Sequence, residues 1–583
     1  MSKLKSLQVA SSLNDIASLL RLKPATLSYI LYKQAAAEKY RSFQIPKKHG
    51  GTRSITAPLG GLKFAQKRLS DLLQECAGEI SEAKGRRDWV SHGFKIKRSI
   101  VTNAGQHRHR RYVFNVDLKD FFPSMNFGRV RGYFIKQHEF ALDAKVATVL
   151  AQIACVNNGL PQGSPCSPVI SNLIAHILDM HCVRLASKVG CTYSRYADDL
   201  TFSTNKKMFP AEIATRSETN PHEWTPGEDL SRLVKRSGFD INPAKTRMQY
   251  RDSRQEVTGL VVNKRINVRC DYRHNVRAMV HKLLKTGSFT TLVPEKDVAS
   301  GTFTIKEKTG TLNQLHGMLS FIGFVDFKNN ERSEIQPNNR TSSAELLQRK
   351  FLLYRDFYAA PSPVIVCEGK TDNIYLLHAI RSLVSQFPDL AGQSAEGKIT
   401  LKIRLYKHSG SRTAKIIGLG DGGSGSLAKF INVFRDDAKG FNAPGQHHPV
   451  IILYDNDAGA KGLAKTLNAG TSVCENGAVK FIHLFRSLYA VPTPPVTGKT
   501  ESKIEDFFEP ALKATKVDGK TFRDDNDADN GQHYGKAIFA HKVVKPNAEQ
   551  INFAGFAPLL TNIVSVLNHH YTGGEITKPV PAG

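Results

Sequence analysis

Asp198 and Asp199 stand side by side between two short segments of strand-forming residues, 192–193 and 200–202. The pattern predicts a β-hairpin that carries both carboxylates at its turn. Neighbouring carboxylates repel each other, so both stay ionised near neutral pH only beside a cation, and a hard divalent metal ion suits their oxygen atoms. A solvated acidic turn is the simpler explanation of an isolated pair, so a chemical role depends on the residues that accompany it.

A third carboxylate, Asp117, ends a mostly apolar segment, 112–116, that is typical of a buried strand. Phosphoryl transfer by a pair of metal ions needs carboxylates from different strands, because the two ions act on the attacking and the leaving oxygen atoms. Asp117, Asp198 and Asp199 would form such a set if their strands are neighbours.

Three further segments carry residues that suit a nucleotide substrate. Residues 45–58 predict a hairpin with glycines at its turn, in which Lys48 and Arg53 are either surface charges or ligands of a triphosphate. A polar turn containing Gln162 is predicted to open a long helix. Lys245 is either an exposed loop lysine or a proton donor.

The net charge of +29 is unevenly distributed along the chain. Residues 1–358 hold 56 Lys and Arg against 31 Asp and Glu, whereas residues 359–583 hold 25 against 21. The segment 84–111 is especially basic and includes the aromatic residues Trp89 and Phe94. Such an excess on one part of a chain indicates a polyanionic partner, most simply nucleic acid.

The chain of 583 residues is long enough for two or more domains. It has no run of 18 or more apolar residues, and its first residues lack the apolar core of a signal peptide, which predicts a cytoplasmic protein without a membrane partner. Its eight cysteines include no Cys-x-x-Cys pair, so neither a zinc site nor a redox motif is expected.

The chain resembles a reverse transcriptase in the order of four segments. They are the Lys/Arg hairpin, the strand ending in Asp117, the Leu-Pro-Gln-Gly turn and the Tyr-Ala-Asp-Asp hairpin. Two short signatures, Asn-Ala-x-x-His from Asn103 to His107 and Val-Thr-Gly at 257–259, resemble motifs of retron reverse transcriptases. The resemblance covers about residues 15–330 and implies an α+β right-hand polymerase fold. Its expected parts are N-terminal helices and fingers in 1–100, a palm in 101–263 with a loop insertion at about 204–228, and a thumb in 264–328.

The resemblance also implies roles for single residues. Asp117, Asp198 and Asp199 would hold two Mg²⁺ ions, and Lys245 would protonate the leaving pyrophosphate. Bulk at Phe122 would exclude a ribose 2′-hydroxyl and so select deoxynucleotides. The other substrate and RNA ligands implied are Lys48, Arg53 and Gln162 for the deoxynucleoside triphosphate, and Asn103, His107, Val257, Thr258 and Gly259 for the RNA.

A linker and bridging helix in 329–362 lead to a second pattern in 363–583. Apolar, strand-like segments end at Glu368 and at Asp455, and a helix-like segment follows each of them. The repeat predicts a mainly parallel sheet with carboxylates at the carboxyl ends of its strands, where α/β sheets place their sites.

Glu-Gly at 368–369 and Asp-x-Asp at 455–457 resemble the Toprim domain of topoisomerases, primases and OLD-family nucleases. The resemblance covers residue 363 to about 490 and implies an α/β Toprim domain within 363–583. Glu368 would act as acid or base, and the implied Mg²⁺ ligands are Glu368, Asp372, Asp455 and Asp457. Features of the nuclease branch extend to four later residues whose roles stay open: Glu505, Asp506, Lys536 and Lys542.

The two resemblances imply a retron reverse transcriptase fused to a Toprim effector, a nuclease in defence against phage. The implied partners are a structured non-coding RNA primed from an internal 2′-hydroxyl, the branched RNA–DNA product (msDNA) and deoxynucleoside triphosphates. The target of the Toprim domain and the formation of a homo-oligomer are left open. The alternatives are a reverse transcriptase of the intron or diversity-generating type, a repair or replication enzyme, and a Toprim part that only binds nucleic acid.

Overall fold

The chain divides into two compact units, each with its own hydrophobic core. The first unit comprises Met1–Arg273, Val293–Lys306 and Phe324–Gln336, and the second comprises His274–Leu292, Glu307–Gly323 and Pro337–Gly583. The computed structural model describes residues 2–47, 51–85, 90–220, 222–296, 303–330, 342–407, 411–420, 422–467, 479–499, 501–524 and 531–572.

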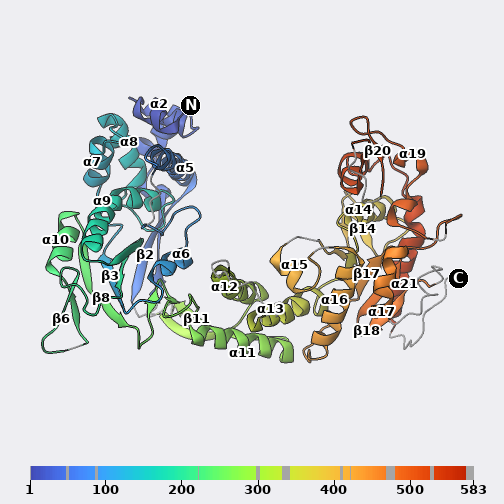
Figure 1. Cartoon of the computed structure of the whole chain (residues 1–583). Helices are drawn as coiled ribbons and strands as arrows, with labels where there is room; N and C mark the ends of the chain where they lie inside the picture. Colours follow the sequence, from blue (N-terminus) through green and yellow to red (C-terminus); the bar gives the residue numbers. More distant parts are fainter. Residues whose placement is uncertain are drawn as a thin grey trace. The chain divides into compact units, whose positions relative to one another are not determined.

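A four-stranded antiparallel sheet with the strand order β4-β5-β3-β8 lies in the first unit (Figure 1). Its strands are β3 (Tyr112–Lys119), β4 (Thr192–Tyr196), β5 (Asp199–Thr204) and β8 (Asp240–Tyr250). The central strands are strongly apolar, as the sequence predicts for a strand that ends in Asp117, and Phe114 and Phe202 are fully buried. The order confirms that the strands carrying the three carboxylates are neighbours.

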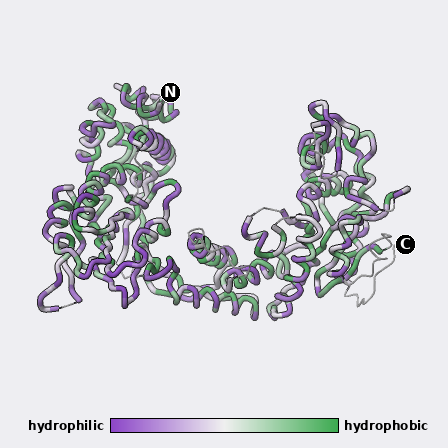
Figure 2. The backbone as a smooth tube through the Cα atoms, in the orientation of Figure 1, coloured by the Kyte–Doolittle hydropathy of each residue, from purple (hydrophilic) through white to green (hydrophobic). Residues whose placement is uncertain are grey.

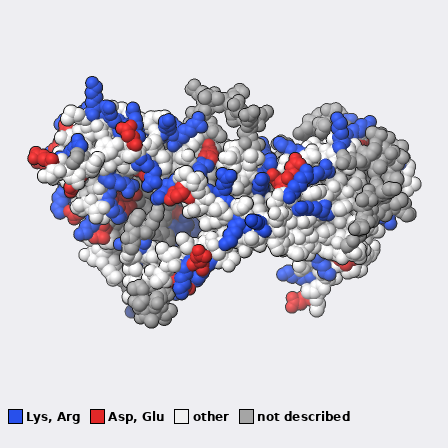
Figure 3. All heavy atoms as spheres, turned by 90° about the horizontal axis from the view of Figure 1, so that it is seen from below, with Lys and Arg blue, Asp and Glu red and all other residues white. Residues whose placement is uncertain are grey.

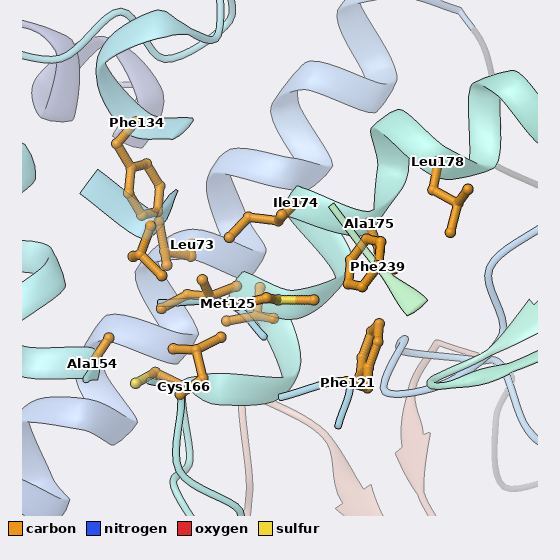
Figure 4. Close-up of a cluster of buried hydrophobic side chains, with 14 of the residues drawn as sticks. Leu73, Phe121, Met125, Phe134, Ala154, Cys166, Ile174, Ala175, Leu178 and Phe239 are labelled. Carbon is orange, nitrogen blue, oxygen red and sulfur yellow. The ribbon is translucent and has the colours of Figure 1, made fainter. Parts of the chain in front are cut away.

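Helices pack around this sheet and supply most of the core of the first unit. Helix α9 (Ser167–Lys188) runs through that core, where Ile174, Ala175 and Leu178 join the cluster shown in Figure 4. By length and composition α9 could cross a membrane, but 56% of its apolar window is buried inside the protein, so it serves as a core helix. The other described helices are α1 (Lys3–Gln8), α2 (Leu13–Leu19), α3 (Pro24–Ser28), η1 (Tyr29–Lys33), α4 (Ala36–Lys39), α5 (Gly60–Ala83), α6 (Ile100–Ala104), η2 (Gly105–His107), α7 (Phe127–Lys136), α8 (Ala144–Ala154) and α10 (Glu228–Arg236).

Three small hairpins complete the first unit. They are β1 (Tyr40–Pro46) with β2 (Thr52–Pro58), β6 (Ala214–Arg216) with β7 (Trp224–Pro226), and β9 (Glu256–Val257) with β10 (Leu260–Val261). The second of them lies in the segment 204–228, where the sequence suggested only a loop. It is anchored because the indole N–H of Trp224 donates to the Tyr250 hydroxyl at 2.7 Å.

Four elements follow β10 and contribute residues to both units: α11 (Cys270–Thr286), β11 (Thr290–Lys296), β12 (Phe303–Thr309) and α12 (Leu312–Asn330). Hydrophobic and hydrophilic residues alternate along the helices of each unit, as the hydropathy colours show (Figure 2). The boundaries of fingers, palm and thumb stay a prediction.

A five-stranded sheet with the order β16-β13-β17-β19-β18 organises the second unit. Only the β18–β19 pair is antiparallel in it. The strands are β13 (Val364–Cys367), β16 (Arg404–Leu405), β17 (Val450–Tyr454), β18 (Ile482–Phe485) and β19 (Leu488–Pro492). Because Cys367 pairs with Leu453, β13 and β17 end at the same edge of the sheet.

Helices and short hairpins surround the second sheet. Among the described helices that lie wholly in the second unit, α16 (Gly423–Ala438) and α21 (Ala557–Tyr571) are the longest, and they bury Phe430 and Ile563 respectively. The remaining elements are α13 (Ser343–Leu353), η3 (Tyr354–Tyr358), α14 (Asp372–Ser382), β14 (Ala391–Gln393), β15 (Ile399–Leu401), α15 (Arg412–Ile416), η4 (Ala458–Ala460), α17 (Lys461–Leu467), η5 (Ile504–Phe507), α19 (Pro510–Lys513), β20 (Thr521–Phe522), β21 (His533–Tyr534), α20 (Lys536–Ile538), η6 (Phe539–Val544) and η7 (Ala554–Phe556).

Candidate active site

The three carboxylates of the first unit meet at one end of its sheet. β4 and β5 are joined by a tight turn in which Tyr196 pairs with Asp199, and Ala197 in that turn has a φ of +56°. On the other side of β5, Asp199 is the register partner of Asp117. The backbone oxygen of Asp198 accepts a hydrogen bond from the Leu118 N–H at 2.9 Å, which ties the turn to β3.

Burial and mutual repulsion shape the charge of this cluster. Burial and the charge of Asp117 raise the pKa of Asp198, against the opposing charges of Lys245 and Arg53. Burial and the charges of Asp198 and Asp117 raise the pKa of Asp199 to about 7. A divalent cation would relieve this repulsion, and carboxylate oxygens are the ligands that Mg²⁺ prefers. The chemistry of the donor set therefore fits the Mg²⁺ ions that the resemblance implies.

Lys245 is the cation that contacts the cluster in this structure. Its Nζ lies 2.8 Å from Asp117 Oδ2, and Asn242 Nδ2 donates to Asp117 Oδ1 at 3.1 Å. Burial alone would lower the pKa of Lys245, but the hydrogen bond to Asp117 and the acidic charges raise it on balance. Among the described residues, no three His, Cys, Asp or Glu side chains are grouped so as to hold a metal ion.

The position of Lys245 depends on an irregular edge strand. One of the two interpretations of Lys245 placed it in an exposed loop, but β8 runs through 242–247, although Pro243 cannot donate a ladder hydrogen bond. β8 lies at the edge of the sheet, where proline is tolerated, and its register with β3 shifts between Asn115 and Asp117. The extra residues on β8 at this bulge include Lys245.

Three of the residues expected to contact the nucleotide lie in the described part of the chain: Arg53, Gln162 and Phe122. Arg53, on β2, is exposed, and its charge is one of the influences that oppose the raised pKa of Asp198. The backbone oxygen of Gln162 accepts a hydrogen bond from Thr56 N–H on the same strand. Phe122 is half-buried beside Phe94, with ring centroids 6.1 Å apart. Lys48 lies outside the described residues.

A buried ion pair that the sequence analysis missed supports the turn that carries Asp198. Arg195 and Asp179 are both fully buried, and Arg195 Nη2 lies 2.7 Å from Asp179 Oδ2. Arg195 Nη1 also donates to the backbone oxygen of Ala197 at 3.0 Å, and the Tyr193 hydroxyl donates to Asp179. The sequence did contain a signal for this pair, because Asp179 is the one acidic residue of the largely apolar helix α9.

The Asn-Ala-x-x-His segment forms a buried chain of hydrogen bonds with the same hairpin. His107 Nδ1 lies 2.7 Å from Ser203 Oγ and its Nε2 lies 2.7 Å from Ser194 Oγ, which donates in turn to Asn103 Oδ1. Burial and the charge of Arg110 lower the pKa of His107 to about 3, so its ring is neutral. Asn103 and His107 have no exposed surface, which favours a positioning role, and their direct contact with RNA stays a prediction.

The Val-Thr-Gly segment turns the chain between β9 and β10. Thr258 and Gly259 have φ values of +49° and +79°, and Val257 pairs with Leu260 across them. Positive φ at both central residues is the geometry of a tight hairpin turn, and it favours glycine. Thr258 is held there because its Oγ1 donates to the backbone oxygen of Ile100, while Gly259 is exposed and Val257 is buried. Of the three, Gly259 is thus the most accessible to solvent.

A second group of acids lies at the carboxyl ends of β13 and β17. Glu368 Oε2 accepts a hydrogen bond from Asp455 N–H at 3.1 Å, and Asp372 Oδ2 accepts one from Gly369 N–H at 2.6 Å. Burial and the charges of Asp372 and Glu505 raise the pKa of Asp455 to about 8. Burial also raises the pKa of Glu368, and the charge of Asp457 adds to this shift.

The structure separates the four later residues whose roles the sequence left open. Glu505 is 1% exposed and accepts a hydrogen bond from Lys536 Nζ at 3.0 Å, and both charges reach Asp455. Asp506 instead accepts from the Lys503 N–H at 3.0 Å, and Lys542 pairs with Asp518 at the surface. Glu505 and Lys536 therefore belong to the second acidic group, whereas Asp506 and Lys542 bind elsewhere.

Comparison with known proteins finds relatives of the part of the chain that holds the first of these sites. Residues 45–263 match the family described as reverse transcriptase (RNA-dependent DNA polymerase). The retron Mx65 reverse transcriptase of Myxococcus xanthus is 33% identical over 288 residues, which are 46% of this chain and 62% of the relative. The retron Ec86 reverse transcriptase of Escherichia coli is 29% identical over 331 residues, 56% of this chain and 88% of the relative.

A solved structure of Candida albicans telomerase with a TWJ fragment of telomeric RNA aligns with 56% of this chain and 64% of that chain, at 11% sequence identity. Its TM-score of 0.29 is too low to support an argument. The chain spans 62% of the length of the Mx65 relative, and the matched family region is less than half of the chain. Residues 45–263 thus form a reverse transcriptase domain, and the chain that carries it is similar to retron reverse transcriptases.

Proposed function

We propose that this protein is an RNA-directed DNA polymerase that copies a structured non-coding RNA as part of a retron. The observation that carries the proposal is the register pairing of Asp117 with Asp199, with Asp198 at the adjoining turn, inside a domain that matches reverse transcriptases. Carboxylates on neighbouring strands are what metal-assisted nucleotide addition requires.

The residues around the acids suit each part of that reaction. Mg²⁺ ions, when bound by the three carboxylates, would activate the attacking hydroxyl and stabilise the negative charge on the leaving pyrophosphate. Arg53 would bind the triphosphate as a bidentate donor, and Lys48 would add a second positive charge. The raised pKa of Lys245 keeps its Nζ protonated, so it holds a proton that can pass to pyrophosphate. Phe122 would press on the sugar and exclude a 2′-hydroxyl.

The retron assignment adds a partner and a product. The RNA would be primed from an internal 2′-hydroxyl and give branched RNA–DNA, with the exposed Gly259 turn contacting the RNA and the reaction taking place in the cytoplasm. The basic composition of residues 1–358 and the spread of Lys and Arg over the face seen in Figure 3 support a polyanionic partner. The Asn-Ala-x-x-His and Val-Thr-Gly segments argue against an intron or diversity-generating enzyme.

A second activity is favoured by the acidic group of the second unit. We infer that it is a Toprim nuclease site, with Glu368 as acid or base and Mg²⁺ held by Glu368, Asp372, Asp455 and Asp457. The raised pKa values of Glu368 and Asp455 are typical of carboxylates gathered for a cation. This nuclease would act as the effector of the retron in defence against phage.

Nucleic acid that copurifies with the protein tests the polymerase and its product together. The purified protein is extracted, and the nucleic acid is treated with RNase and with a 2′–5′ debranching enzyme. A short DNA of one sequence joined to RNA is the expected result. Heterogeneous DNA, or none, would overturn the retron assignment.

Two variants make this experiment specific. Asp198→Asn should remove the DNA while leaving the fold intact, because it deletes one charge from a cluster that repels itself. Asp252→Asn changes an exposed acid of the same unit and should leave the DNA in place. Loss of DNA in both variants would point to a general effect of charge rather than to the site.

A further inference from the structure

Residues 90–94 lie against the strand that leads into the catalytic turn. The Arg195 N–H donates to the Val90 backbone oxygen at 2.7 Å, and the His92 N–H donates to the Arg195 oxygen at 2.8 Å. Ser91 and Arg195 thereby form a parallel bridge at the edge of β4. The segment is thus fixed to the hairpin that carries Asp198 and Asp199.

Gly93 brings this segment into direct contact with the catalytic turn. A Cβ at this position would lie 2.6 Å from the backbone nitrogen of Ala197, closer than side chains approach backbone atoms. The Gly93 oxygen accepts a hydrogen bond from Asn172 Nδ2 at 2.7 Å, which fixes it from the side of α9. The chain entering position 94 therefore has little freedom.

Phe94 leaves this fixed segment in an unusual conformation. Its φ of +59° lies in the left-handed region, which costs an ordinary residue about 1–2 kcal/mol and persists only where the surroundings impose it. The ring is 46% exposed, although burying a phenylalanine is favourable. It is instead tilted against the ring of Phe122, at 6.1 Å between centroids and 51° between planes.

Apart from Phe94, Phe122 makes one other ring contact among the described residues, and it also packs against the core of the first unit. That ring contact is with Phe121, T-shaped at 5.4 Å between centroids, and Phe121 is itself stacked on Phe239. Phe122 is only half-buried, so its ring could adopt another rotamer if the second aromatic contact were lost. A residue that excludes an atom by bulk works only while its ring stays in place.

We propose that Phe94 is a positioning residue for sugar selection: it holds the ring of Phe122 against the place where a ribose 2′-hydroxyl would lie. The inference rests on the proposed polymerase function and deepens it. Phe94 thereby helps the enzyme to discriminate between deoxyribonucleoside and ribonucleoside triphosphates. It does so through Phe122 and does not touch the sugar itself.

Single-nucleotide incorporation on an RNA template with a DNA primer tests the proposal. The quantity measured is the ratio of kcat/KM for a deoxynucleotide to that for the matching ribonucleotide. Phe94→Ala should lower this ratio about tenfold, within the range that small changes in a pocket produce. Phe94→Tyr, which keeps the ring, should retain the ratio.

Phe64→Ala is the matched control, since Phe64 is also 46% exposed and lies on α5. It should leave the ratio unchanged. The double variant Phe94→Ala/Phe122→Ala should discriminate no worse than Phe122→Ala alone, because a residue that acts through another adds nothing once that residue is gone.

An unchanged ratio in Phe94→Ala, or additive losses in the double variant, would overturn the proposal while leaving the polymerase function standing. A wild-type protein that incorporates no deoxynucleotide would instead overturn the polymerase function itself.

Discussion

At the scale of single residues, the site depends on backbone position as much as on charge. Burial and the charge of Asp117 raise the pKa of Asp198, and burial with the charges of Asp198 and Asp117 raises that of Asp199. This arrangement favours a bound cation. The turn that carries them is held by Arg195 at the Ala197 oxygen and approached by Gly93 at the Ala197 nitrogen. Small displacements of this turn should therefore reduce the rate more than they reduce stability.

Gly93→Ala tests that dependence directly. The added methyl group would lie 2.6 Å from Ala197 N, so the turn must move, and a misplacement of about 1 Å can cost about a hundredfold in rate. We expect kcat for nucleotide incorporation to fall at least tenfold, while the thermal unfolding midpoint changes by only a few degrees. Gly132→Ala, on α7 with nothing within 4 Å of the new Cβ, should leave kcat unchanged. Equal rates for the two variants would contradict the argument.

His107 should make the first unit sensitive to acid. Its pKa is lowered to about 3 in the folded chain, against about 6.5 when unfolded, so between these values the unfolded chain binds a proton that the folded chain does not. Stability should therefore fall as the pH falls from about 6.5 towards 3. In His107→Gln the unfolding midpoint, followed by circular dichroism at pH 7, 6 and 5, should drop less steeply with pH than in the wild type. His138→Gln, at an exposed position, should keep the wild-type slope, and a wild-type slope in both variants would contradict the prediction.

At the scale of elements, the sequence predicts the strands that carry acids better than the strands that support them. β3, β4 and β5 could be predicted because apolar runs flank Asp117 and the Asp198 turn. β8 could not, since Pro243 breaks the strand pattern and only an edge position with a bulge accommodates it. The positive φ of Phe94 and the pairing of residues 90–92 with β4 depend on contacts made from far along the chain, which no local pattern encodes.

The buried pair of Arg195 and Asp179 links α9 to β4 and should affect stability and rate separately. Asp179→Asn leaves the Arg195 charge without its partner and should destabilise the first unit by about 3–5 kcal/mol. Replacing both residues by apolar ones, Asp179→Leu with Arg195→Met, should restore most of that stability. Activity should not return, because the Ala197 oxygen then lacks its donor.

Chemical denaturation and nucleotide incorporation measured on the same preparations separate the two effects. Asp71→Asn serves as the control, because Asp71 pairs with Lys67 at the surface, where an ion pair contributes about 0–1 kcal/mol. A double variant with wild-type stability and wild-type rate would show that the pair only holds the fold together.

At the scale of the whole molecule, the chain carries two acidic sites in two units, each with its own core. The first lies in a reverse transcriptase domain within the strongly basic part of the chain. The second lies at the carboxyl ends of parallel strands in a part that is close to neutral. Sequence patterns predicted Glu368 and Asp455 because each follows an apolar strand, but they could not separate Glu505 from Asp506, which are adjacent in sequence and bind different partners.

The two sites should be separable by mutation, and lysines of the second unit offer a matched pair for the test. Lys536 donates to the buried Glu505 and its charge reaches Asp455, whereas Lys542 pairs with Asp518 at the surface. Lys536→Met should therefore reduce Mg²⁺-dependent cleavage of nucleic acid about 10- to 100-fold, as expected for a residue that supports metal ligands, and Lys542→Met should not.

Both variants should still incorporate deoxynucleotides. Asp198→Asn should show the reverse pattern, with cleavage retained and incorporation lost. Cleavage that survives in both Lys536→Met and Asp455→Asn would show that the acidic group of the second unit does not perform it.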